Sequence, residues 1–449
     1  MAQKADLAAK RAVTVLGAGI AGLYAAEHLT RAGHRVTVVE RSRQCGGAHR
    51  SANIGPYTFD IGSIFYERNA LIFHLAKGLI DKCPNVLRQQ RRIAPDGALL
   101  HYPLAPREVL RTRPWRVPLG VMDMLASRLL VRQDGTLDAI SRKRLGSIFF
   151  RDTGLRAYIS RFNHVPPEDI DEQFFFRRMG FIEQATRLAN LAKVATRLIY
   201  SDSGFKTPRK PLYVRPQGGF GELFDPIRER LEAAGVKFHF LEDITAIEQI
   251  GSGFRLQGTS QQFQADCVVS TISLSALYAM LFGESPGLAS LDMTTLFVSA
   301  EKFATRAGNV LFNFHDQGHW KRATIYSRIY AGTDTDREFL GVEVTIPPGG
   351  KHDPEAMFAD FRDHLTRLGL AQDLRLEGSA FNEAAYPLYL KGSDVRLDAA
   401  LARVHETGII SVGRQGRFEY LPTSTGVIAR VGEELDKAFT ASRLEAQAS

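Results

Sequence analysis

The spacing of glycines near the N-terminus constrains this chain more than any other feature. Gly17, Gly19 and Gly22 form a G-x-G-x-x-G pattern directly after the apolar run 13–16, and an alanine-rich segment follows. A second β-branched run, 35–40, ends in an acidic residue 18 positions after the last glycine. This order predicts strand, tight turn, helix and second strand, which is the unit that binds a dinucleotide.

Each glycine has a separate task in such a unit. Gly17 permits the tight turn, Gly19 lets a pyrophosphate approach the backbone, and Gly22 lets the helix pack closely on the strand. The helix would begin near Ile20 and Ala21 and hold the phosphates at its N-terminus. Free N–H groups and the helix dipole favour negative charge at that position.

The residues after the second strand extend the expected site. Glu40 at the tip of the strand would accept hydrogen bonds from ribose hydroxyls, and Arg41 follows it. The pair Gly46 and Gly47, with Arg50 three residues later, resembles an extension in the superfamily of amine oxidases, protoporphyrinogen oxidases and UDP-galactopyranose mutases. FAD is long, so more backbone must pass close to it, and nicotinamide enzymes lack this second motif. The resemblance therefore implies FAD as the cofactor.

Composition indicates an ordinary globular protein without a metal site. The 449 residues, of which 44% are hydrophobic and 24% charged, can form two or three structural units. The three cysteines have no spacing typical of a metal site or a disulfide framework. The N-terminus does not resemble a signal peptide, and no apolar run approaches the roughly 18 residues of a membrane span. We expect a soluble, cytoplasmic protein with at most peripheral membrane contact.

The net charge of +8 is unevenly distributed. Residues 107–156 contain eleven Arg or Lys against five Asp or Glu, a local excess of six positive charges. Such a patch could attract an anionic substrate or a membrane surface, and a solvated basic face explains it equally well. Because no aromatic and basic binding motif accompanies the patch, we expect no nucleic-acid partner.

Three later stretches also resemble the superfamily. The sequence at 60–63, Asp-Ile-Gly-Ser, is similar to the segment that runs beneath the flavin ring, which implies contacts from Gly62 and Ser63. The backbone of Ile244 would pass near the adenine end. Near the C-terminus, the resemblance implies contacts of Gly413 and Arg414 with the pyrophosphate or ribityl chain. Tyr420 completes the expected cofactor contacts.

These features predict an α/β fold. We expect a Rossmann-type FAD-binding domain, glutathione reductase-like and of the p-hydroxybenzoate hydroxylase type, with a helical insertion and an antiparallel-sheet substrate domain. The cofactor domain would comprise residues 10–90, 208–289 and 402–445. The insertion, 91–207, would start with a hairpin through Asp96 and Gly97, and the substrate domain would occupy 290–401. A helix is expected from about residue 69.

The leading functional hypothesis is an FAD-dependent oxidase or dehydrogenase that transfers a hydride from a small molecule to flavin N5. No Ser/His/Asp set stands out, and the candidates for the substrate cavity are Tyr326, Arg328 and Tyr386. Oligomeric state is not predicted.

The alternative is a non-redox mutase of a nucleotide-sugar, in which reduced flavin acts as a nucleophile. The stretches 312–332 and 385–392 resemble UDP-galactopyranose mutases. Two departures count against it. Ser63 stands where the mutase signature has histidine, and LPTST follows Tyr420 where mutases carry an acidic stretch.

Overall fold

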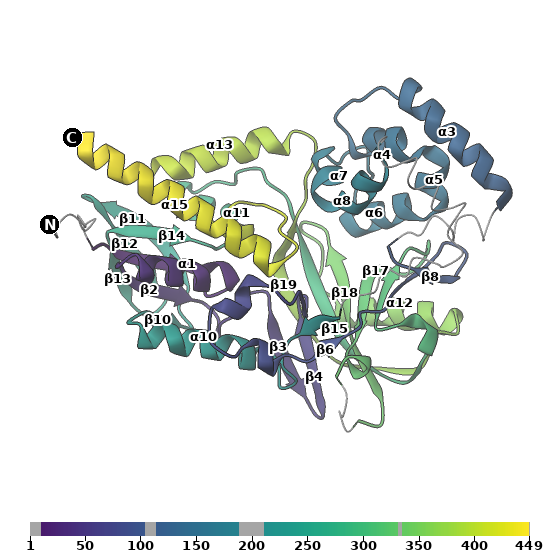
Figure 1. The fold of residues 1–449 in the computed structure, drawn as a ribbon, viewed down its shortest axis with the longest axis horizontal. Helices are drawn as coiled ribbons and strands as arrows, with labels where there is room; N and C mark the ends of the chain where they lie inside the picture. Colours follow the sequence, from purple (N-terminus) through teal and green to yellow (C-terminus); the bar gives the residue numbers. More distant parts are fainter. Residues whose placement is uncertain (1–9, 104–113, 188–210, 331–334, 449) are drawn as a thin grey trace.

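The computed structural model describes residues 10–103, 114–187, 211–330 and 335–448, and they form an α/β fold built on two main sheets (Figure 1). Of the helical insertion expected at 91–207, residues 104–113 and 188–207 lie outside the described part. Among the described residues, no helix combines the length and the hydropathy that crossing a bilayer requires.

The first sheet is parallel and has the strand order β10-β2-β1-β14-β20. Its strands are β1 (Ala12–Leu16), β2 (Arg35–Glu40), β10 (Lys237–Phe240), β14 (Cys267–Ser270) and β20 (Ile410–Ser411). They are short apolar runs, as expected of parallel strands covered on both faces. The predicted strand-turn-helix-strand unit is confirmed, because α1 (Ile20–Arg31) connects β1 to β2.

Helices and a small antiparallel sheet cover the two faces of this sheet. Val13 and Val15 share one apolar core with Leu23 of α1, whereas Leu16 shares another with Leu256 of the small sheet. Figure 1 shows α15 crossing over α1. The covering elements are α10 (Gly221–Ala233), α11 (Leu274–Phe282), α13 (Ser393–Glu406), α14 (Gly413–Gly416), α15 (Ser424–Ala448), β11 (Ile244–Ile250), β12 (Gly253–Gly258) and β13 (Gln262–Ala265).

The second sheet has seven strands in the order β19-β15-β18-β17-β16-β7-β8, with helix α12 (Pro354–Arg367) packed on it. The strands are β7 (Gln90–Ile93), β8 (Leu99–His101), β15 (Ser290–Phe303), β16 (Val310–Asn313), β17 (Trp320–Ile325), β18 (Glu338–Ile346) and β19 (Ala371–Pro387). The expected antiparallel pairing holds for five neighbouring pairs, but β16 and β7 are parallel. The sheet is therefore mixed, because the predicted hairpin β7–β8 joins its edge.

Smaller elements connect the two sheets. These are the hairpin β3 (Arg50–Ile54) and β4 (Tyr57–Ile61), the three-stranded set β5 (Phe65–Tyr66), β9 (Leu212–Val214) and β6 (Asn85–Val86), and the 3-10 turns η1 (Leu71–His74), η2 (Ile80–Lys82), η4 (Thr305–Ala307) and η5 (Tyr326–Arg328). The prediction of a helix from about residue 69 was wrong, because only the 3-10 turns η1 and η2 form there. Gly78, with φ of +77°, interrupts the segment between them.

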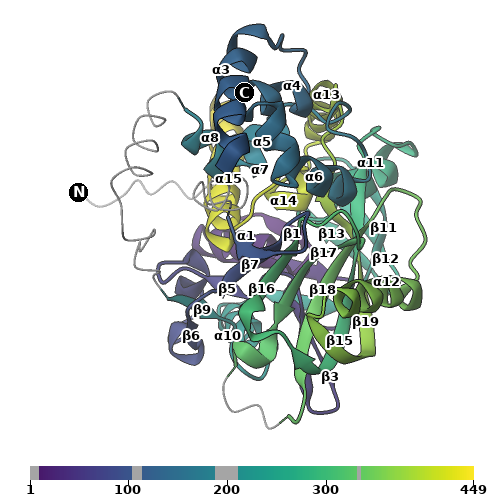
Figure 2. The same cartoon turned by 90° about the vertical axis from the view of Figure 1, so that its right-hand side faces the viewer.

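A group of short helices lies at one end of the molecule, beside the β7–β8 hairpin (Figures 1 and 2). They are α3 (Val117–Leu130), α4 (Leu137–Leu145), α5 (Ser147–Asp152), α6 (Leu155–Asn163), α7 (Gln173–Arg178) and α8 (Gly180–Ala185), preceded by the turn η3 (Pro114–Arg116). Residues of α6 and α7 reach the large sheet. Phe162 of α6 packs on Tyr386 of β19 with ring centres 5.4 Å apart, and Arg178 of α7 lies 5.2 Å from the same ring centre.

Candidate functional site

Two glycine turns touch each other at the N-terminus of α1. Gly19 forms a parallel bridge with Gly46, whose N–H donates to the carbonyl of Ala18 at 2.9 Å. A Cβ atom placed on Gly47 would lie 3.1 Å from the Cα atom of Gly19. The two backbones therefore meet with no side chain between them. We call this contact and the residues around it the glycine junction, residues 17–22, 46–47 and 413.

The third part of the glycine junction comes from the C-terminal region. Gly413, with φ of +78°, approaches α1 so closely that a Cβ atom on it would lie 2.6 Å from the Cβ atom of Ala21. Within the first unit, a Cβ on Gly22 would lie only 1.8 Å from the carbonyl oxygen of Gly17. Helix α1 starts at Gly19 without a side-chain cap and with no acidic residue in its first turn. Its first N–H groups and the positive end of its dipole thus suit an anion.

Glu40 ties the end of β2 to the glycine junction. One carboxylate oxygen accepts from the N–H of Ala18 at 2.7 Å and the other from Ser42 at 2.8 Å. A carboxylate has about four acceptor positions, so this buried group keeps capacity for hydroxyl donors. The N–H of Glu242 donates to the carbonyl of Glu40 at 3.1 Å, which brings the nearby start of β11 at Ile244 toward this end.

Arg41 and Arg50 differ in their surroundings. Arg41 is exposed and lies 3.7 Å from Glu383, which is also exposed. Arg50 begins β3, and its Nε atom is buried without a hydrogen-bond partner within the described part of the chain. Burial lowers the pKa of Arg50, and the nearby Glu40 opposes this shift. A buried donor that lacks an acceptor is unfavourable, so a ligand with acceptor groups fits beside Arg50.

The loop at 60–63 lies against the loop at 46–49. Gly62 has φ of +89°, and a Cβ on it would lie 2.6 Å from the carbonyl oxygen of Ala48. Ser63 follows it and is partly buried. Burial first, and the positive charge of Arg414 second, lower the pKa of His49 to about 4. His49 is therefore neutral near pH 7.

A buried ion pair fixes the loop that contains Gly62. Nε of Arg215 donates to both carboxylate oxygens of Asp60, at 3.0 and 2.9 Å, and both side chains are almost fully buried. Ser51 donates to the same carboxylate at 2.5 Å. Tyr326 is buried too and donates its hydroxyl to the carbonyl of Asp60 at 3.1 Å. Tyr326 thus anchors this loop instead of pointing into a substrate cavity as predicted.

Arg328 also differs from its predicted orientation. Its Nε and one terminal nitrogen bind the two oxygens of Glu338 at 2.6 and 2.8 Å. The guanidinium further donates to the carbonyl oxygens of Phe303, at 2.7 Å, and Gly308, at 2.8 Å. Through these contacts the guanidinium of Arg328 connects β15, η4 and β18. Arg328 is therefore a structural residue of the second sheet.

Tyr386, the third candidate, lies among positive charges. Its hydroxyl accepts from Nζ of Lys321 at 2.9 Å, and Lys321 in turn lies 3.3 Å from Glu343. Arg322 also bonds to Glu343. Burial and Glu343 raise the pKa of Tyr386, but Lys321, Arg322 and a further arginine outweigh them and hold it below its usual value.

Two arginines from distant segments complete this group. Arg178 of α7 lies 4.3 Å from the ring centre of Tyr420 and 5.2 Å from that of Tyr386, and Arg414 lies 5.0 Å from Tyr386. The Nε atoms of both arginines are buried without a hydrogen-bond partner in the described structure. We call the whole set the basic–tyrosine cluster: Arg178, Lys321, Arg322, Arg414, Tyr386 and Tyr420.

The basic–tyrosine cluster adjoins the glycine junction, because Arg414 follows Gly413 directly. Sequence reasoning included Tyr386, Arg414 and Tyr420 but missed Arg178, Lys321 and Arg322. No local motif marks these three residues. They depend on contacts between residues that are not neighbours in the chain, such as Arg178 with Tyr386, and such contacts leave no signal in the sequence.

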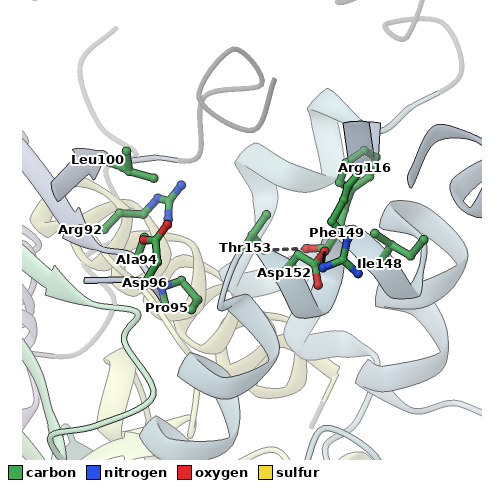
Figure 3. A pocket seen from close by; sticks show the side chains of 10 residues that line it. All are labelled: Arg92, Ala94, Pro95, Asp96, Leu100, Arg116, Ile148, Phe149, Asp152 and Thr153. Atoms are coloured by element: carbon green, nitrogen blue, oxygen red, sulfur yellow. Dashed lines mark hydrogen bonds and ion pairs between the residues drawn. The ribbon is translucent and has the colours of Figure 1, made fainter. Parts of the chain in front are cut away.

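Two surface clefts lie in another part of the molecule. Figure 3 shows one cleft between the β7–β8 hairpin and α5, where Arg116 faces Asp152 at 3.0 Å. A neighbouring cleft of about 640 Å³ shares these two residues and Pro95. Neither cleft includes a residue of the glycine junction or of the basic–tyrosine cluster. We place the candidate site at the glycine junction because backbone approach and unpartnered donors coincide there. No cluster of metal-ligating side chains occurs among the described residues.

Comparisons with known proteins found one family model and several relatives similar to this chain. The model of the family described as flavin containing amine oxidoreductase matches residues 20–344. L-amino acid oxidase Lm29 of Lachesis muta is 32% identical over 120 residues, covering 21% of this chain and 22% of its own length. An L-amino-acid oxidase of Crotalus adamanteus is 26% identical over 198 residues, covering 35% and 37%. The matches thus span well under half of these relatives.

Solved structures share the fold over nearly the whole chain. A reduced UDP-galactopyranose mutase has a TM-score of 0.75 at 17% identity and covers 96% of both chains. A putative protoporphyrinogen oxidase from Exiguobacterium sp. 255-15 has a TM-score of 0.67 at 17% identity, covering 96% and 98%. A putrescine oxidase variant has a TM-score of 0.58 at 17% identity, covering 96% and 99%. At these identities the likeness concerns the fold.

Proposed function

Since the chain belongs to the family of flavin-containing amine oxidoreductases, whose members carry a flavin, we propose that it is an FAD-dependent oxidoreductase. In this proposal the parallel sheet and its covering helices are the FAD-binding domain, Rossmann-type and glutathione reductase-like. The seven-stranded sheet and the helices α3–α8 enclose the substrate. The observation that carries the proposal is the meeting of three distant glycine turns at the uncapped start of α1.

The residues present fit FAD. The first N–H groups of α1 suit the diphosphate, Glu40 retains acceptor capacity for ribose, and the buried Nε of Arg50 lacks an acceptor. The proposed cofactor contacts are Gly17, Gly19, Ile20, Ala21, Gly22, Glu40, Arg41, Gly46, Gly47, Arg50, Gly62, Ser63, Ile244, Gly413, Arg414 and Tyr420. When bound, FAD supplies a hydride acceptor for a C–H bond of the substrate.

The basic–tyrosine cluster would hold the substrate. The cluster contains four cations, whereas one carboxylate, Glu343, pairs with two of them, Lys321 and Arg322. Burial raises the pKa of Glu343, but Arg322 and Lys321 outweigh burial and bring it below its ordinary value. The excess positive charge, with unpartnered Nε donors on Arg178 and Arg414, favours a small molecule with an anionic group. The aromatic faces of Tyr386 and Tyr420 would limit its orientation.

The second candidate is a non-redox mutase acting on a nucleotide-sugar. The specific observation in its favour is the same pair of arginines, Arg178 and Arg414, because two guanidinium groups near the ring of Tyr386 suit a diphosphate. Ser63, in place of the histidine of the mutase signature, remains the argument against it.

The proposal is tested first by cofactor uptake. We expect the purified protein to be yellow or to take up added FAD, and to be bleached anaerobically by an amine or amino acid substrate without added reductant. Turnover of a nucleotide-sugar that appears only after dithionite reduction would support the mutase instead. Protein that folds but takes up no FAD would contradict both.

A pair of variants tests the substrate site separately. Arg178→Met removes a charge-assisted contact, of about 1.5–3 kcal/mol, which corresponds to a KM increase of about 10-fold to 100-fold. FAD absorbance should be unchanged. The matched control is Arg177→Met, because Arg177 is the preceding residue of α7 and is exposed. Equal KM values for the two variants would refute the anionic substrate while leaving the flavin assignment intact.

A further inference from the structure

Helix α3 presents its apolar residues to solvent. Beginning in the turn η3, large apolar side chains recur every three or four positions, which places them on one face of the helix. Their exposed fractions are 70% for Trp115, 56% for Leu119, 65% for Met122, 52% for Leu125 and 88% for Leu129. Leu130, at 81%, extends this surface at the end of the helix. We call these six residues the α3 apolar face.

The opposite side of α3 is small and polar, and it faces the protein. Asp123 accepts from the N–H of Ile148 at 2.8 Å, at the start of α5, and Ser127 bonds to Asp123 at 3.3 Å. At Gly120, a Cβ atom would lie 2.6 Å from the ring of Phe149, so only glycine allows this approach. The orientation of the helix is thus fixed by its inner contacts. A surface helix usually packs its apolar side on the protein and exposes its polar side, and α3 does the reverse.

An apolar surface of this extent in water marks an interaction site. Figures 1 and 2 both show α3 at the outer edge of the group of helices, which agrees with the exposure of the α3 apolar face. Positive charge borders it. Arg132 follows the helix and is exposed, and Arg128 donates to the carbonyl of Thr186 at 2.8 Å, which leaves its charge in place.

We propose that the α3 apolar face lies in the surface of an anionic lipid bilayer. A helix of 14 residues is about 21 Å long, too short to cross the roughly 30 Å core, and therefore it would lie parallel to the surface. Trp115 would sit at the level of the headgroups, where tryptophan is enriched, and Arg132 would contact lipid phosphates. This inference concerns where the protein acts and does not depend on its reaction.

The experiment uses the full chain and vesicles of phosphatidylcholine with or without phosphatidylglycerol. The chain has two tryptophans, and Trp320 is completely buried, so a change in emission reports on Trp115. We expect co-sedimentation and a blue shift with the anionic vesicles, and much weaker binding without phosphatidylglycerol. The double variant Met122→Glu, Leu129→Glu should lose binding at least tenfold, with unchanged flavin content and unfolding midpoint.

The control is Val395→Glu, which places one such negative charge on an apolar residue of α13 that is 70% exposed. This variant should bind vesicles like the wild type. Three results would overturn the proposal: no binding to anionic vesicles, equal loss in the control, or a wild-type dimer that the double variant separates. Emission of Trp115 already shielded from acrylamide without lipid would also overturn it, because the face would then be covered by the chain itself.

Discussion

Replacing Gly22 by alanine has two opposing effects on stability: better helix propensity and a steric clash. Gly22 lies in helix α1, where helix propensity alone favours alanine by about 0.5–1 kcal/mol. The added Cβ would lie 1.8 Å from the carbonyl oxygen of Gly17, although contacts below 3.0 Å essentially never occur. The helix or the turn must therefore move by about 1.2 Å, the difference between these distances.

Overpacking of this kind typically costs about 1–3 kcal/mol, and the atom displaced here belongs to the backbone. We therefore expect Gly22→Ala to lower the free energy of unfolding by at least about 1 kcal/mol despite its better propensity. FAD affinity should fall as well, because the same displacement changes the glycine junction. Urea unfolding and a titration with FAD measure the two effects.

The matched control is Gly180→Ala at the start of α8, where a Cβ would meet nothing within 4 Å. This variant should be as stable as the wild type or up to about 1 kcal/mol more stable. If Gly22→Ala were equally stable and bound FAD with unchanged affinity, the close packing inferred at the glycine junction would be refuted.

Two further predictions concern buried ionisable side chains away from the proposed substrate site. Arg215→Met should lower the free energy of unfolding by about 3–5 kcal/mol, because Asp60 is left buried without its partner. In urea unfolding, adding Asp60→Asn should recover part of this loss. Wild-type stability of the single variant would contradict the prediction. Burial, and then His315, lowers the pKa of His364 to about 4, whereas an unfolded histidine titrates near 6.5. The unfolded state therefore binds an extra proton between these values, so this residue makes stability fall as pH drops from about 6.5 to about 4. NMR of ¹⁵N-labelled histidine should find His364 neutral at pH 5, and a charged ring there would disprove the assignment.

Local patterns in the sequence were sufficient for the first unit of the fold. The glycine spacing and β-branched runs of residues 13–40 depend on neighbours in the chain, and β1, α1 and β2 form as predicted. The hairpin through Gly97 was also predicted correctly, since its turn residues determine it locally. Its parallel alignment with β16 was not, because that pairing depends on a segment more than 200 residues away.

The side chains of the candidate site were harder to predict for the same reason. Alternation along a strand gives the face on which a residue lies but does not identify its partner. Tyr326 and Arg328 therefore looked equivalent to Tyr386, yet Asp60 and Glu338 engage the first two in structural contacts. The position of Arg178 in the site was not predicted, because its neighbours come from α6, β19 and the segment at Tyr420.

The strands of the parallel sheet come from segments that are far apart in the chain, which affects when the sheet can be completed during translation. Strand β20 and Gly413, which completes the contact with Ala21, leave the ribosome only after the first 400 residues have been translated. A nascent chain can form β1, α1 and β2 early but cannot complete the glycine junction until Gly413 has been made. We therefore expect the proposed cofactor to be bound only after Gly413 has emerged from the ribosome, and products of earlier termination to remain without it.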